Sequence, residues 1–148
     1  MPTFAFDDRN TRWHTLDGIE YLHYAILDID EPNKIIDILY KFAANRQIVL
    51  HRHKSLNHML VIQGEHWLYH PNGEVKEIRP TGRYTVVPAS EDPHREGGGK
   101  DQDVVVYFSI RGSDGVLYEI LDDDLNPIGE LSFADFVALK KAQDAAVG

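Results

Sequence analysis

Short runs of β-branched and aromatic residues recur along most of this chain of 148 residues, and turn-forming residues separate them. Asp17-Gly18 and Asn72-Gly73 are the clearest turn signals, because both dipeptides suit tight turns with positive φ. The segments that we expect to be strands include 19–29, 34–43, 59–63, 83–87 and 104–110. Many short strands at regular spacing predict an all-β sandwich or barrel.

The segment 34–43 allows a second interpretation. Its isoleucines, Leu39 and Phe42 also fit the apolar stripe of an amphipathic helix. We interpret the segment as a strand, because Ala44-Asn45-Arg46 resembles a hairpin turn into the next strand, 47–53.

The end of the chain has the pattern of a helix. Ser132 followed by Asp135 resembles a capping box, with Asp in place of the usual Glu or Gln. Residues at helical spacing follow at Phe133, Phe136, Val137 and Lys140. We therefore expect a C-terminal α-helix over 131–145. The whole chain, 1–148, fits a single domain, with residues 1–12 as an N-terminal arm.

Composition excludes several classes of function. The chain has no cysteine, so a metal site would consist of histidine and carboxylate groups. The net charge is −9 and no Lys/Arg cluster stands out, so we expect no nucleic-acid partner. No apolar run approaches about 20 residues and the N-terminus lacks a secretory pattern, so we expect no membrane partner and a cytoplasmic location.

Histidines are concentrated in one stretch. His51, His53 and His58 lie within eight residues, and His94 follows a predicted strand that Pro88 ends. Residues i and i+2 of a strand share a face, so His51 and His53 project side by side and can bind one metal ion. The histidines that we expect to be merely exposed or hydrogen-bonded are His14, His23, His66 and His70.

Three residues near His94 are candidates for a general base: Glu91, Glu96 and Tyr84. The stretch from Glu96 through three glycines to Lys100 has the composition of a flexible loop tip. For the walls of a binding site, alternation places His58, Leu60 and Ile62 on one face of a strand.

The histidine spacings resemble the two sequence motifs of the cupin superfamily. The first cupin motif contains His-x-His, a Glu after three or four residues, and a Gly six residues later. Here it reads His51-x-His53-x4-His58-x5-Gly64, so a histidine stands where most cupins have the glutamate.

The second cupin motif contains Gly-x5-Pro, then Gly, then His. Gly82 and Pro88 match it and His94 follows, although the intervening glycine is absent. The resemblance covers about residues 34–111. It implies an RmlC-like jelly-roll barrel, also called a double-stranded β-helix, with the C-terminal helix added to it.

Histidine at position 58 makes the chain similar to a subgroup of small cupins. This subgroup includes 2,4′-dihydroxyacetophenone dioxygenase, acetylacetone-cleaving dioxygenase and the cupin domain of zinc anti-sigma factors. The resemblance implies that His51, His53 and His94 bind a divalent metal, with His58 as a fourth ligand or a donor to a ligand. Fe(II) is favoured, and Zn or Ni would also suit such a site.

The function implied by this resemblance is oxidative C–C cleavage of a small β-diketone or hydroxyketone that binds as its enolate. Two alternatives stay open: a non-catalytic metal- or small-molecule-binding cupin of the sensor type, and a zinc-dependent isomerase, lyase or hydrolase. The expected partners are a small-molecule substrate and further copies of the chain. A sheet that is apolar on both faces, together with the resemblance, favours a homodimer or homotetramer.

Overall fold

The computed structural model describes residues 5–112 and 115–146 of the chain. Its elements, in chain order, are β1 (His14–Leu16), β2 (Ile19–Asp30), β3 (Ile35–Phe42), β4 (His51–His53), β5 (Leu56–Gln63), β6 (His66–Tyr69), β7 (Val75–Arg79), β8 (Tyr84–Val87), β9 (Arg95–Gly97), β10 (Val104–Arg111), β11 (Val116–Leu121), β12 (Pro127–Ser132) and α1 (Phe133–Ala145). The ambiguous segment 34–43 is therefore a strand, and the predicted all-β class with one C-terminal helix is confirmed.

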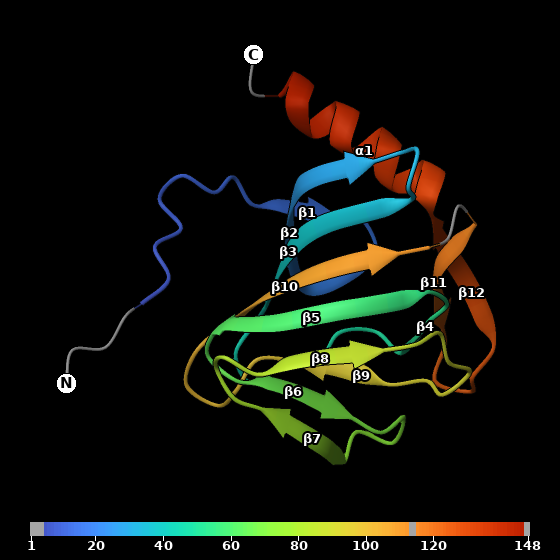
Figure 1. The fold of residues 1–148 in the computed structure, drawn as a ribbon. Helices are drawn as coiled ribbons and strands as arrows, with labels where there is room; N and C mark the ends of the chain where they lie inside the picture. The colour runs from blue at the N-terminus through green and yellow to red at the C-terminus, as the bar shows by residue number, and fades with distance from the viewer. Residues whose placement is uncertain (1–4, 113–114, 147–148) are drawn as a thin grey trace.

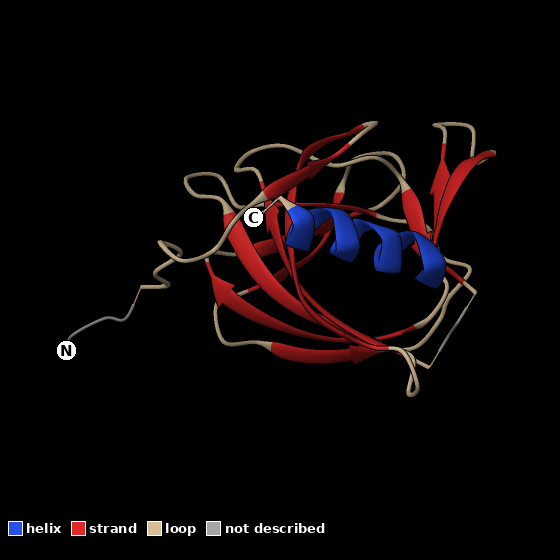
Figure 2. Cartoon of the chain, turned by 90° about the horizontal axis from the view of Figure 1, so that it is seen from above, coloured by secondary structure: helices blue, strands red, loops and turns tan. Residues whose placement is uncertain are grey.

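The strands form three antiparallel sheets (Figure 1). The largest has the order β1-β2-β3-β10-β5-β8, and the two smaller sheets have the orders β12-β11-β4 and β7-β6-β9. Seen from above, the strands curve around a common interior and α1 lies along its outside (Figure 2). Among the described residues, no helix has the length and apolar character needed to cross a membrane.

Strand β10 lies at the centre of the fold and is buried on both faces. One face of β10, which includes Phe108, packs into the main core with β3 and β5. The opposite face contributes Val105 to a second cluster, against which Phe6 and Trp13 from the N-terminal segment pack. Because both faces are covered, every residue from 104 to 110 except Ser109 is aliphatic or aromatic. Residues 1–4 of the predicted arm lie outside the described residues.

The capping box begins α1 as predicted. The backbone N–H of Asp135 donates to Ser132 Oγ at 3.1 Å, and the Ser132 N–H donates to Asp135 Oδ2 at 2.8 Å. Phe133 and Phe136 are the buried residues of the helix. The helix begins at Phe133 rather than 131, because the preceding residues extend strand β12 along β11.

The glycine-rich stretch is not the flexible loop tip that its composition predicts. Glu96 and Gly97 belong to strand β9, and Gly97 to Gly99 are all buried. A Cβ atom at Gly97 would lie 1.8 Å from the carbonyl oxygen of Arg46. Glycine is therefore needed here because another backbone segment approaches closely. Glu96, the residue before Gly97, is also buried.

We predict that Gly97→Ala lowers the free energy of unfolding by about 2 kcal/mol or more, because backbone atoms must move to admit the methyl group. Gly129→Ala is the matched control: its added Cβ would meet only Ile120 Cβ, at 3.9 Å. Urea unfolding of both variants measures the difference. Equal free energies of unfolding for the two variants would contradict the prediction, because they would show that the Arg46 backbone moves aside without cost.

Candidate metal centre

Four side chains converge in the interior: His51 and His53 from β4, His94 just before β9, and Glu96 within β9. One nitrogen or oxygen from each lies within 4.8 Å of the others. A backbone bridge joins the two segments: His51 N–H donates to His94 O at 3.1 Å, and His94 N–H donates to His51 O at 3.0 Å. Residues i and i+2 of a strand share a face, so His51 and His53 project together, as do His94 and Glu96. The backbone bridge directs both pairs toward the same point.

The carboxylate of Glu96 lies between the three imidazole rings. Its Oε2 atom lies 2.7 Å from His51 Nε2, 3.5 Å from His53 Nε2 and 3.5 Å from His94 Nε2. His51 and His53 are each 3% exposed and Glu96 is 2% exposed, so bulk water does not solvate this group. Such a buried cluster of charge and lone pairs needs a compensating partner.

The arrangement of lone pairs fits a cation. His51 Nδ1 donates to the carbonyl oxygen of Val49 at 2.8 Å, so Nε2, which faces Glu96 at 2.7 Å, is the ring nitrogen that would bind a metal. His53 Nε2 and His94 Nε2 lie 3.1 Å apart, and among the described residues the buried His53 Nδ1 has no hydrogen-bond partner. Three imidazoles and one carboxylate suit divalent transition metals.

Burial governs the protonation of two of the histidines. It lowers the pKa of His94 to about 3 and also lowers the pKa of His53. Both rings are therefore neutral near pH 7, which is the form that binds a metal.

His66 positions the carboxylate. Its Nε2 lies 2.8 Å from Glu96 Oε1, and its fully buried ring stacks on Phe42 with centroids 5.4 Å apart. Burial would raise the pKa of Glu96, but hydrogen bonds from His51, His53, His66 and His94 hold the pKa well below its usual value. Glu96 is therefore an anion. This role of His66 was not predictable from its position in a strand, because alternation alone does not say which face is interior.

His58 and Tyr84 are not brought to this cluster. Alternation along β5 buries Asn57 and Met59 and directs His58 to the outer face, where its Nδ1 atom pairs with the hydroxyl of Tyr84. Tyr84 is 56% exposed. The expectation that His58, Leu60 and Ile62 line the interior wall is wrong, because the opposite parity of β5 faces the core.

Glu91 also lies away from the cluster. Its side chain is 78% exposed and forms an ion pair with Lys54, which lowers the pKa of the Glu91 carboxyl. Of the three candidates for a general base, the structure places only Glu96 in the centre, as a fourth donor atom beside the histidines.

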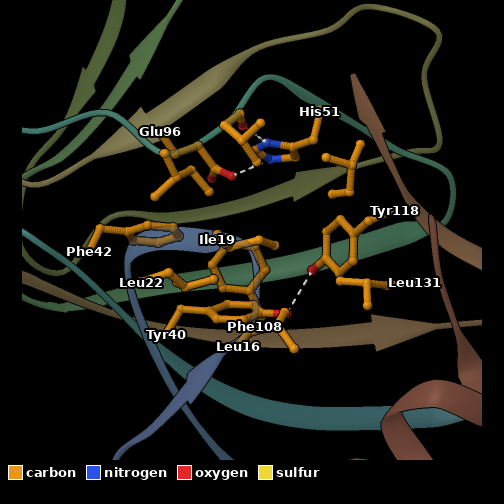
Figure 3. Close-up of a pocket in the computed structure, with 13 residues that line it drawn as sticks. Leu16, Ile19, Leu22, Tyr40, Phe42, His51, Glu96, Phe108, Tyr118 and Leu131 are labelled. Atoms are coloured by element: carbon orange, nitrogen blue, oxygen red, sulfur yellow. Dashed lines mark hydrogen bonds and ion pairs between the residues drawn. The ribbon is translucent and has the colours of Figure 1, made fainter. Parts of the chain in front are cut away.

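Two cavities border the cluster. The first is apolar: Figure 3 shows His51 and Glu96 on one side of it, with Tyr40 and Tyr118, whose hydroxyls lie 3.3 Å apart, among the residues on the other. It holds about 40 Å³, little more than one water molecule. The second holds about 250 Å³ and is bordered by His53, His94 and Glu96. A small organic molecule fits only the second cavity.

No protein-family model matches the chain, and no curated protein matches its sequence. Solved structures match it by fold. An RmlC-like cupin protein from Ralstonia eutropha JMP134 has a TM-score of 0.73 and 17% identity, over 99% of this chain and 89% of that chain. An acetylacetone dioxygenase from Acinetobacter johnsonii has a TM-score of 0.67 and 10% identity, over 96% of this chain and 93% of that one.

A third match is the Rhodobacter sphaeroides structure of SigE in complex with the anti-sigma ChrR, with a TM-score of 0.55 and 20% identity, over 69% of this chain and 50% of that chain. These identities are low, so the likeness concerns the fold. The matches agree with the curved antiparallel sheets and the C-terminal helix described above. The chain therefore has the RmlC-like cupin fold, with a buried cluster of three histidines and one glutamate in its interior.

Proposed function

We propose that this chain is a metal-dependent cupin dioxygenase that cleaves a C–C bond of a small β-diketone or hydroxyketone bound as its enolate. The observation that carries the proposal is the convergence of His51, His53, His94 and Glu96, of which the last three border a cavity of about 250 Å³. The likeness to an acetylacetone dioxygenase supports the choice of reaction. Fe(II) is the favoured metal, with Zn or Ni as further candidates.

The charge of the donor set suits an anionic ligand. Three neutral imidazoles and the Glu96 carboxylate reduce a divalent ion to a net charge of about +1, which still attracts an enolate. The all-histidine site expected from the sequence would have left the full charge of +2. When bound, the metal supplies a Lewis acid and, if it is iron, a redox centre.

The protein's own groups orient and shield the reacting molecule. The Val49 carbonyl fixes the tautomer of His51, and His66 fixes the carboxylate of Glu96. Met59 and Leu68 give the cavity an apolar wall, which limits water beside the substrate.

A non-catalytic sensor is the second candidate, supported by the likeness to the structure that contains the anti-sigma ChrR.

A homodimer or homotetramer is also part of the proposal. Exposed apolar side chains on the outer face of β5 and β8 support it: Leu56, Leu60, Tyr84 and Val86.

Metal content and oxygen uptake distinguish the candidates. After anaerobic purification we expect about one divalent ion per chain, measured by elemental analysis, because the donor set forms one site. Iron together with dioxygen consumption on 2,4-pentanedione or related dicarbonyls supports the dioxygenase. Tightly bound zinc with no uptake on any tested dicarbonyl would exclude it.

Single substitutions test the ligand set. His51→Ala and His94→Ala should each lower the bound metal at least about tenfold, because each removes one donor from a four-donor site. His58→Ala is the matched control and should retain the metal of the wild type. Full metal content in both ligand variants would refute the assignment of the centre.

His66 tests the support of the carboxylate. His66→Ala should weaken metal affinity by about 10–100-fold, because Glu96 Oε1 loses its buried donor. His66→Gln restores an N–H donor and should recover part of the affinity. Competition with a chelator measures both variants; unchanged affinity in His66→Ala would assign His66 to packing against Phe42 alone.

A further inference from the structure

The larger cavity contains a buried guanidinium group in addition to the metal centre. Arg79 ends strand β7 and is the one buried residue of that strand, with a side chain 9% exposed. The other charged residues of the wall outside the centre, Lys76, Glu77 and Asp92, are all exposed. Arginine is seldom buried unless its charge is paired, so the partners of Arg79 are informative.

The pairing of Arg79 is incomplete. Its Nε donates to the carboxylate of Glu77, which is 44% exposed, and its Nη1 contacts the Met59 sulfur at 3.7 Å. A guanidinium group has five N–H donors, and a thioether is only a weak acceptor. Among the described residues, no other acceptor contacts the Arg79 side chain. The Nη1 and Nη2 groups at the end of the guanidinium, called the fork below, are therefore open to a ligand.

Arg79 also lies close to the metal centre. It is the register partner of His66 on the neighbouring strand, and both side chains are buried. His66 in turn binds Glu96. Directly opposite residues of an antiparallel pair project to the same side of a sheet, so Arg79 and the centre border one cavity.

We propose that Arg79 selects an acidic substrate: its free fork binds a carboxylate, while the carbonyl or enolate oxygens of the same molecule reach the centre. That the other end of this molecule binds a metal at the centre is an assumption taken from the function proposed above. The substrate class is thereby narrowed from neutral diketones to small dicarbonyl or hydroxyketone acids. Arginine suits this task because its planar fork matches a carboxylate with two parallel hydrogen bonds. Glu77 holds Nε and so fixes the direction in which the fork points.

The alternative is that Arg79 and Glu77 are only a structural ion pair. In that case the cavity would not distinguish an acid from its neutral ester, and Arg79 substitutions would alter stability without altering selectivity.

Direct binding separates these cases without relying on turnover. Isothermal titration calorimetry under anaerobic conditions would compare 2,4-dioxopentanoate with its methyl ester on the zinc-loaded full chain, and on the metal-free chain if no metal binds. We expect the acid to bind at least about tenfold more tightly, as for a charge-assisted bidentate hydrogen bond.

Arg79→Met keeps the apolar volume and should abolish this preference while changing the ester's affinity less than about twofold. Arg79→Lys should retain part of the preference, and Lys76→Met, on the exposed rim, should retain all of it.

Each result has a defined meaning. Equal affinity for acid and ester in the wild type, or no binding of either, overturns the role of Arg79, and this comparison does not depend on any variant folding. Dioxygen uptake on neutral diketones with no acid preference would overturn this inference alone. A clear acid preference in a protein that consumes no dioxygen would support it and refute the dioxygenase.

Discussion

The centre depends on one pair of backbone hydrogen bonds, those between His51 and His94. They hold β4 against the start of β9, two segments more than forty residues apart in sequence, and thereby bring both halves of the donor set together. The alternation of a strand then places His53 and Glu96 on the same side as their neighbours. The backbone register thus directs the four side chains to one point, and the contacts with Val49 and His66 orient their polar groups.

Electrostatics explains why this arrangement calls for a cation. A buried carboxylate is unfavourable alone, and Glu96 is held as an anion by imidazoles on both of its oxygens. The neutral rings of His53 and His94 cannot cancel that negative charge. A divalent ion would neutralise it and would be bound by the Nε2 atoms of His53 and His94, which lie 3.1 Å apart. Folding and metal affinity are thus linked through the same few atoms.

The all-β class and the terminal helix were predictable from local signals, the cupin fold from the resemblance of the histidine spacings, and the site only in part. Strand propensity, turn dipeptides and the Ser132 capping box are properties of neighbouring residues, so they can be read from the chain. Motif spacing also indicated His51, His53 and His94. Glu96 was predicted as a general base and not as a member of the donor set, because its three following glycines suggested flexibility, whereas a close approach to the Arg46 backbone buries the first of them.

The error over His58 has a different physical origin. Alternation divides β5 into two sets of residues, but only tertiary packing decides which set faces inward, and both sets contain apolar side chains. The same limit applies to His66 and Arg79, whose buried positions depend on the pairing of β6 with its neighbours.

The unequal sizes of the two cavities give the centre a single direction of approach. The apolar cavity beside His51 has room for about one water molecule. A larger ligand therefore reaches the donor atoms through the other cavity, beside His53 and His94. If the chain acts as proposed, a metal ion and a substrate would share this route. On the same proposal, a ligand in the larger cavity would cover that route and slow the escape of the ion.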